Sequence, residues 1–181
     1  MADKKEQVQT PYANNHLLEI LAALNKADVK YVVCGGVAVV LHGGERMTLD
    51  LDLSVDMQRE NMQRFLDVMK ALHLHPRVPL PPEVLLDSEK VQAMIEEKNA
   101  LVFTFVDSDN PYRQVDVFLT EEHSYDLLAE DAHQVSIGED IINVVSRERL
   151  IAMKQKIKPL RLKDRFDLEH LLELMHKSER L

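Results

Sequence analysis

Hydrophobic residues recur with two different periods along the chain, and these periods separate predicted helices from predicted strands. The helical period is clearest at Leu17, Ile20, Leu21 and Leu24, which are spaced three or four residues apart. By such spacing and by capping residues, we predict helices over residues 16–28, 37–42, 58–73, 88–99, 124–131, 147–156 and 162–176. Runs of β-branched and apolar residues predict strands over residues 30–34, 47–55, 101–106 and 114–119, with one or two more between 135 and 145.

The segments between these elements refine the prediction. Asp107–Pro111 has turn chemistry, so the strands on either side of it are expected to form a hairpin. Residues 76–82 hold four prolines and are expected to form a loop. Ser88 and Ser146 are predicted helix caps. The predicted core face of the last helix consists of Phe166, Leu168, Leu171, Leu172 and Met175.

The order of these elements defines a fold class. Helices and strands are mixed along the chain, which predicts an α/β (α+β) fold with a small mixed β-sheet flanked by helices and a C-terminal helical segment. We expect a flexible N-terminal tail over residues 1–15, a main domain over residues 16–145 and the C-terminal helices over residues 146–181, packed on that domain.

Residues 47–55 alternate strictly between apolar and polar, which is typical of a half-buried strand. Asp50 and Asp52 therefore share one face of this strand, with their Cα atoms about 6.5–7 Å apart. Asp116 lies between Val115 and Val117 in another predicted strand, so its side chain faces away from these valines. The pattern predicts that the three carboxylates come together on one face of the sheet.

Carboxylates held this close repel one another, and a divalent cation would remove that repulsion. Mg²⁺ prefers oxygen ligands and leaves positions open for substrate phosphates, so we expect Mg²⁺ (or Mn²⁺) at Asp50, Asp52 and Asp116. Three acids on adjacent strands suit a two-metal site for in-line phosphoryl transfer. Gly35 and Gly36 follow a predicted strand directly, where backbone N–H groups can meet a phosphate.

Composition limits the class of protein. The chain of 181 residues is 45% hydrophobic and 29% charged, which is typical of a globular protein. It shows no apolar run long enough to span a bilayer and no apolar segment of a signal peptide at its start. The single cysteine, Cys34, excludes an intrachain disulfide and is expected in the core. We therefore expect a cytoplasmic protein without a membrane partner.

The charge is unevenly distributed. The whole chain carries −9, but residues 147–165 hold eight basic and two acidic residues, a net charge of +6. This basic segment could bind a polyphosphate or an RNA backbone. Alternatively, it is a solvated helix face that pairs with the acidic remainder of the chain.

The segment from Gly35 to Leu53 carries a family resemblance. The glycine pair, the Leu41-His42-Gly43 run and the Arg46-x-Thr48-x-Asp50-x-Asp52-Leu53 pattern resemble the nucleotidyltransferase superfamily, which shares its fold with DNA polymerase β. Within it, the layout looks closest to AbiEii-like toxin-type and minimal nucleotidyltransferases. The resemblance covers residues 30–119 and continues loosely over residues 144–172, which include Lys154, Lys163 and Asp164.

The resemblance implies roles for individual residues. Asp50 and Asp52 would bind metal, with Asp116 as third ligand and as base for the acceptor hydroxyl. The nucleotide-binding residues it implies are Gly35 and Gly36 against the triphosphate, Arg46 or Thr48 beside it, and Lys154 and Lys163 on its phosphates. One departure is Val37, where many members have a serine or threonine whose hydroxyl binds phosphate.

Each of these residues also has a structural interpretation. Arg46 could serve only a structural role, as the ion-pair partner of Glu45 or Asp50. Asp164 and Asp167 are expected to orient Lys163, Arg165 or a backbone cap rather than bind metal. His42 is expected to be a packed or capping histidine. His73 and His75 have no cysteine near them, which argues against a zinc site.

The resemblance implies an enzyme that moves a nucleoside monophosphate from an NTP to a hydroxyl acceptor, which could be tRNA, a protein or a small molecule. It also suggests an antitoxin partner, and the small C-terminal segment leaves room for a homodimer. The alternative is a non-catalytic nucleotide- or partner-binding module with the same fold. A metal-dependent nuclease is a more distant alternative, since it would not need the glycine turn.

Overall fold

The computed structural model describes residues 16–178, so the predicted tail over residues 1–15 lies outside the described residues. The helices are α1 His16–Lys26, α2 Gly35–Leu41, α3 Arg59–Ala71, α4 Ser88–Lys98, α5 Tyr125–Ala129, α6 Arg147–Gln155 and α7 Leu162–Ser178, with short 3-10 helices η1 Pro82–Leu86 and η2 Glu121–His123. The strands are β1 Tyr31–Val33, β2 Asp50–Val55, β3 Leu74–Pro76, β4 Val102–Asp107, β5 Gln114–Phe118, β6 His133–Ile137 and β7 Asp140–Val144. Most of the predicted elements are confirmed to within a few residues.

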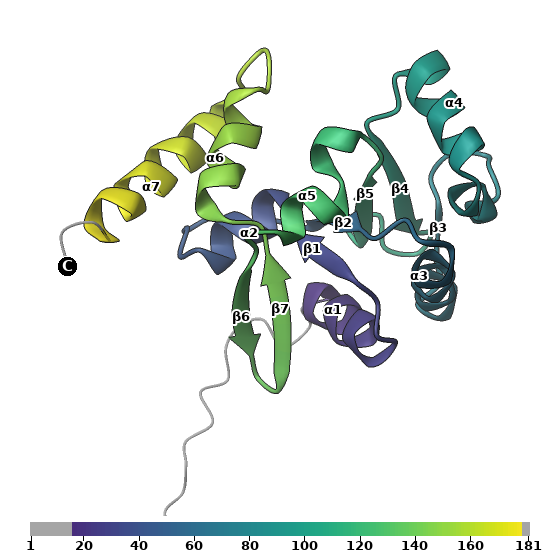
Figure 1. Cartoon of the computed structure of the whole chain (residues 1–181). Helices are drawn as coiled ribbons and strands as arrows, with labels where there is room; N and C mark the ends of the chain where they lie inside the picture. The colour runs from purple at the N-terminus through teal and green to yellow at the C-terminus, as the bar shows by residue number, and fades with distance from the viewer. Residues whose placement is uncertain (1–15, 179–181) are drawn as a thin grey trace, which may run out of the picture.

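The strands form one mixed sheet in the order β3-β4-β5-β2-β1-β7-β6. β2 pairs in parallel with β5 and antiparallel with β1, and β4 and β5 form the predicted hairpin. Figure 1 shows α6 and α7 side by side at one end of the molecule, near α2, while α4 lies at the opposite end. The predicted α/β fold with a mixed sheet and C-terminal helices is confirmed.

The core is built from the periodic positions of the sequence. Ile20, Leu21 and Leu24 of α1 are buried, as are Leu51 and Leu53 of β2. In β2 and β5 these apolar side chains alternate with half-buried polar ones, because successive strand residues point to opposite faces. One face of the central strands therefore packs on the core, and the other carries the aspartates.

Several predicted details are wrong. β2 begins at Asp50, not Met47, and Met47 is 87% exposed. α2 begins at Gly35 rather than Val37. The helix α4 is capped by Asp87, whose side chain accepts hydrogen bonds from the backbone N–H groups of Glu89 and Lys90, so Ser88 is not the cap. By contrast, the cap at Ser146 is confirmed by its hydrogen bond from the Arg149 N–H group.

Two further differences concern the edges of the structure. β3 was not predicted, because it holds a proline; it lies at the edge of the sheet, where a missing N–H donor is tolerated. In α7, Leu171 is buried as predicted, but Phe166 is 61% exposed and Leu172 39% exposed. No helix among residues 16–178 has the length and apolar character needed to cross a membrane.

Candidate active site

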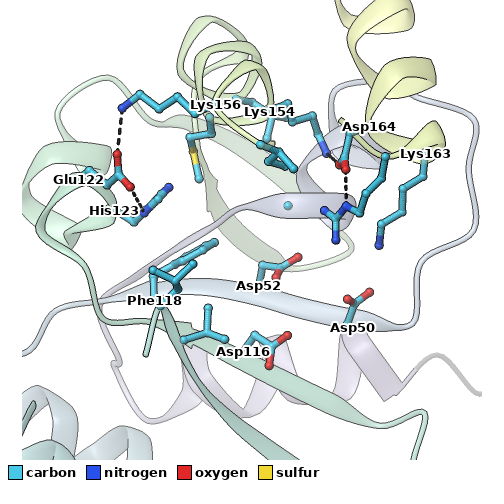
Figure 2. Close-up of a pocket in the computed structure, with 18 of the residues that line it drawn as sticks. Asp50, Asp52, Asp116, Phe118, Glu122, His123, Lys154, Lys156, Lys163 and Asp164 are labelled. Carbon is cyan, nitrogen blue, oxygen red and sulfur yellow. Dashed lines mark hydrogen bonds and ion pairs between the residues drawn. The ribbon is translucent and has the colours of Figure 1, made fainter. Parts of the chain in front are cut away.

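Three carboxylates meet on the open face of β2 and β5. The register of the parallel pair sets Asp52 directly beside Asp116, and Asp50 lies two residues earlier on the same face. One carboxylate oxygen from each residue lies within 4.8 Å of those of the other two. Figure 2 shows the three side chains on neighbouring strands, facing one cleft. The predicted convergence of the three acids is therefore confirmed, whereas their catalytic and metal-binding roles stay predictions.

Neutral donors hold two of these carboxylates in place. The Thr48 hydroxyl donates to Asp50 Oδ1 over 3.2 Å. Asp116 accepts at both oxygens, from the Thr104 hydroxyl (2.5 Å) and from the Gln114 side-chain amide (2.8 Å). Such donors fix the direction of a carboxylate but leave its negative charge uncompensated. Thr104 and Gln114 are neighbours that sequence reasoning missed, although they flank Asp116 in the predicted hairpin.

Asp52 shows the electrostatic cost of this arrangement. Burial, followed by the charges of Asp50 and Asp116, raises the pKa of Asp52 from 3.8 to about 6. The backbone N–H of Gly36 and the charge of Lys154 act in the opposite direction, but more weakly. A close set of oxygen donors with an unfavourable negative charge fits a hard divalent cation such as Mg²⁺ or Mn²⁺.

The two glycines at the start of α2 are explained by contacts with the strand beside them. Gly35 has φ +57, and the Asp52 carboxylate fills the space that a Cβ atom on Gly35 would need. A Cβ atom on Gly36 would lie 2.6 Å from Thr48 Oγ1. Both glycines therefore allow the aspartate strand to approach α2 closely, and their predicted contact with a triphosphate stays a prediction.

A buried charged cluster faces the aspartates across the cleft. Lys154 of α6 is 5% exposed, and its Nζ atom contacts Asp167 at 2.7 Å and Asp164 at 3.3 Å, both on α7. Asp164 also binds Arg161 (2.5 Å). The expectation that Asp164 and Asp167 orient Lys163, Arg165 or a backbone cap is therefore wrong. They hold Lys154, Arg161 and Arg46 instead.

Arg46 joins this cluster to the segment that carries Thr48. Its guanidinium binds Asp167 at 2.6 Å, so its partner is neither Glu45 nor Asp50 as the alternative interpretation held. Lys163 also lines the cleft but is exposed and has no ion pair among the described residues. Figure 2 shows its side chain directed toward the Asp50 side of the triad. Arg46, Lys154 and Lys163 thus line the same cleft as the aspartates, and their predicted contacts with phosphate stay predictions.

The basic segment over residues 147–165 agrees in part with each of its two interpretations. Much of its charge is paired with acidic residues, as in the contacts of Arg149 with Glu130 and Asp131 and of Lys156 with Glu122. However, Lys154, Lys156, Lys158, Arg161 and Lys163 also line the cleft. The pKa of Arg161 is raised, first by its hydrogen bond to Asp164 and further by Asp52 and Asp50, so this positive charge lies close to the triad.

The cleft has a volume of about 560 Å³ and includes an apolar end that the sequence reasoning missed. Phe118 lies there, two residues after Asp116, and its ring stacks on His123. Strand alternation assigns Phe118 to the same face as Asp116, so the signal was present in the sequence. His42 and Cys34 take the structural roles expected of them. His42 is buried and bonds the Val145 carbonyl, and Cys34 is buried in the core.

Comparison with known proteins agrees with this geometry. The chain is similar in fold to a lincosamide antibiotic adenylyltransferase, LnuA, with a TM-score of 0.61, 16% identity and coverage of 89% of this chain and 97% of that one. It is also similar to the antibiotic-resistance factor ANT(2'')-Ia, with a TM-score of 0.55, 14% identity and coverage of 92% and 90%. A third similar structure is that of a Thermotoga maritima protein described as a nucleotidyltransferase, with a TM-score of 0.53, 15% identity and coverage of 92% of this chain and 94% of that one.

The sequence itself gives a more specific result. Among curated proteins, none matches the chain by sequence. The profile of one family, described as nucleotidyl transferase AbiEii toxin of the type IV toxin–antitoxin system, matches residues 16–181. This match includes the aspartate strands, the glycine pair and the helices of the charged cluster. The chain belongs to the AbiEii nucleotidyl transferase family.

Proposed function

We propose that this protein transfers a nucleoside monophosphate from an NTP to a hydroxyl acceptor, with a divalent metal ion held by Asp50, Asp52 and Asp116. The observation that carries the proposal is the meeting of three carboxylates within 4.8 Å of one another at the base of a cleft whose opposite wall is cationic. Carboxylates and cations on facing walls match the two halves of a metal–triphosphate complex. Mg²⁺ or Mn²⁺ would supply Lewis-acid activation of the acceptor and stabilisation of the leaving group.

The residues of the chain divide the remaining work. Lys163, Lys154 and Arg46 would contact the phosphates and stabilise the charge that develops on the leaving pyrophosphate. Gly35 and Gly36 would let the phosphates approach the backbone of α2. Asp116, oriented by Thr104 and Gln114, would accept the proton of the acceptor hydroxyl.

The family match supports a further step in this proposal, namely that the chain is the toxin of a toxin–antitoxin pair. In that case its expression in a bacterial host would arrest growth, and an Asp116→Asn variant would not. The acceptor could be tRNA, a protein or a small molecule, and the cationic wall favours a polyanionic one. Arrest by the Asn variant as strong as by the wild type would separate toxicity from nucleotidyl transfer.

A thermal melting scan tests the nucleotide site directly. Each of the four NTPs is added with and without Mg²⁺ to the wild type, to Asp116→Asn and to the control Asp109→Asn, whose side chain is exposed. A ligand present at a free concentration of one hundred times its Kd stabilises the folded state by about 2.7 kcal/mol. We expect a metal-dependent rise in Tm with at least one NTP, retained in the control and lost in Asp116→Asn.

The alternative function, a non-catalytic binding module, is favoured by Val37, which supplies no phosphate-binding hydroxyl. It predicts that NTPs raise the Tm of Asp116→Asn as much as that of the wild type, and that no labelled NMP appears on any acceptor. That pair of results would refute the proposed transfer. Transfer of labelled NMP that depends on Asp116 would instead exclude the module.

A further inference from the structure

The cleft face of the sheet changes character along the direction of β2 and β5. Asp50 pairs with Gln114, and Asp52 pairs with Asp116 in the next row. Phe118 follows two residues after Asp116 on the same face and pairs with Val102 of β4. The face thus runs from polar residues, through the carboxylates, to an aromatic and apolar end.

The phosphate-binding groups lie at the end opposite Phe118. A Cβ atom on Gly36 would lie 2.6 Å from Thr48 Oγ1 and 3.1 Å from Arg46 Nη2, so these three residues are neighbours beside Asp50. Lys163 approaches from the same side, and in Figure 2 it lies across the triad from Phe118 and His123. The cleft therefore has one end with Arg46 and Lys163 and another with the stacked Phe118 and His123 beside the Lys156–Glu122 ion pair, with the three aspartates between them (Figure 2).

A ring stack and two hydrogen bonds organise the aromatic end. The rings of Phe118 and His123 stack with centroids 4.6 Å apart and an angle of 17° between their planes. The buried Ser54 hydroxyl donates to the His123 carbonyl over 2.6 Å, and the Thr120 hydroxyl lies 2.8 Å from His123 Nδ1. Hydrogen bonds thus hold His123 at both its backbone carbonyl and its ring.

In-line transfer assigns this end to the acceptor. The attacking and leaving oxygens lie on opposite sides of the reacting phosphorus. If the pyrophosphate leaves toward Arg46 and Lys163, the hydroxyl must approach from the Phe118 side of Asp116. We propose that Phe118 and His123 form the acceptor subsite, and that the acceptor is an alcohol carrying a flat, unsaturated ring. This inference rests on the proposed function.

The step balances without another reactant. The acceptor oxygen forms a bond to the α-phosphorus, while the bond from that phosphorus to the oxygen bridging to the β-phosphorus breaks. The pyrophosphate departs with the electron pair of that bond, and the hydroxyl proton passes to Asp116. Pyrophosphate and a phosphodiester are the products.

The shape of the subsite defines the ring. Flat rings stack favourably on aromatic side chains, and Phe118 lies on the same strand face as Asp116, about 6.5–7 Å away along the strand. The reacting hydroxyl therefore lies within a few bonds of the ring. Leu101, which is 63% exposed, and Met153 and Ile157 of the opposite wall add further apolar surface to the same cleft. Aryl alcohols and nucleosides share this chemistry.

Saturation-transfer NMR tests the subsite without requiring turnover. The probes are benzyl alcohol and cyclohexylmethanol, which differ in the flatness of the ring. The variants are Phe118→Leu and the control Phe166→Leu, whose wild-type side chain is 61% exposed on α7. We expect a saturable saturation-transfer signal for benzyl alcohol. The signal for cyclohexylmethanol should be at least about fivefold weaker, because its ring is not flat. The signal should be lost in Phe118→Leu and retained in Phe166→Leu, while both variants keep the wild-type Tm within a few degrees. Equal signals for the two alcohols, or no effect of Phe118→Leu, would overturn the proposal.

Two additional measurements separate this inference from the proposed function and identify the source of the ring. If Mg²⁺·NTP does not raise the Tm of the wild type, the proposed function fails, whatever the NMR result for the ring. If Mg²⁺·NTP raises the Tm but benzyl alcohol does not bind at Phe118, only the acceptor subsite fails. Cytidine and benzyl alcohol are each titrated in the presence of saturating Mg²⁺·NTP. Tighter binding of cytidine that is lost in Phe118→Leu identifies a nucleoside acceptor, and tighter binding of benzyl alcohol that is lost in this variant identifies an aryl alcohol.

Discussion

The Asp52 carboxylate occupies the space beside Gly35 that any other residue would fill with its Cβ atom. Glycine is therefore required at position 35 for two reasons: the close approach of the Asp52 carboxylate, and the left-handed backbone with φ +57. This contact joins the start of α2 to the centre of the triad. A side chain at position 35 would displace the carboxylate whose pKa is raised by burial and by the charges of Asp50 and Asp116.

Gly35→Ala separates steric displacement from backbone strain when it is compared with Gly138→Ala. Gly138 has φ +63 but lies in open space, so its substitution should cost only the left-handed strain, about 1–2 kcal/mol. Gly35→Ala should cost more than this and should also weaken Mn²⁺ binding. Urea unfolding and a metal titration on both variants measure the difference. Equal destabilisation with unchanged metal binding would show that Asp52 is not displaced.

Asp52→Asn is expected to stabilise the metal-free protein above pH 6. The pKa of Asp52 is raised to about 6, so the folded protein binds a proton more tightly than the unfolded chain does. Stability is therefore lost as the pH rises from about 4 to about 6, by at most about 3 kcal/mol. Asparagine carries no charge and avoids this loss.

Thermal melts with EDTA measure this effect at about pH 4 and about pH 7.5. At the lower pH the Tm of Asp52→Asn should equal that of the wild type. At the upper pH the Tm of Asp52→Asn should be higher. Asp109→Asn is the exposed control and should follow the wild type throughout. A lower Tm for Asp52→Asn at the upper pH would contradict the assigned repulsion.

Asp167→Asn tests the buried charged cluster. Asp167 binds both Arg46 and Lys154, so its loss leaves Arg46 without its partner and Lys154 with Asp164 alone. Breaking a buried ion pair costs about 3–5 kcal/mol. The control Glu169→Gln removes an exposed contact with Arg165 at 4.0 Å and should cost less than about 1 kcal/mol. Urea unfolding of the two variants gives the comparison, and similar values for both would refute a structural role for the cluster.

Lys163→Ala should affect ligand binding without affecting stability. Lys163 is exposed and has no ion pair among residues 16–178, so its removal should change the free energy of unfolding by no more than about 0.5 kcal/mol. A charge contact near the surface contributes about 1–4 kcal/mol, so the Kd for Mg²⁺·NTP should rise at least about fivefold. Lys98→Ala, at an exposed position of α4, should leave the Kd unchanged. Isothermal titration measures both, and an unchanged Kd in Lys163→Ala would remove Lys163 from the nucleotide site.

The alternating pattern of residues 47–55 predicted the essential part of the site. Strand periodicity alone set Asp50 and Asp52 on one face and oriented Asp116 toward them, because side-chain direction in a strand follows from its backbone. The same rule extends to Phe118, which lies two residues after Asp116 and therefore on the same face. By contrast, the cap at Asp87 depends on one local hydrogen bond, and neighbouring Ser88 has equal propensity for the role.

Contacts between distant elements were harder to predict. The Arg46–Asp167 pair joins residues 121 positions apart, and no local pattern identifies its partner. Lysine and aspartate on a helix are usually solvated, so the burial of Lys154 with Asp164 and Asp167 gave no periodic signal. Phe166 follows the helical spacing of α7 yet is 61% exposed. Periodicity identifies a face of a helix but does not show how far the neighbouring helix covers it.

The central claim is that Asp50, Asp52 and Asp116 bind a divalent cation, and Mn²⁺ binding followed by electron paramagnetic resonance tests it most directly. The measurement uses wild type, Asp52→Asn and Asp109→Asn without nucleotide, and the signal of free Mn²⁺ reports the bound fraction. Loss of one carboxylate ligand should weaken binding at least about tenfold in Asp52→Asn, and Asp109→Asn should bind as the wild type does. Equal Mn²⁺ binding by wild type and Asp52→Asn would contradict the account.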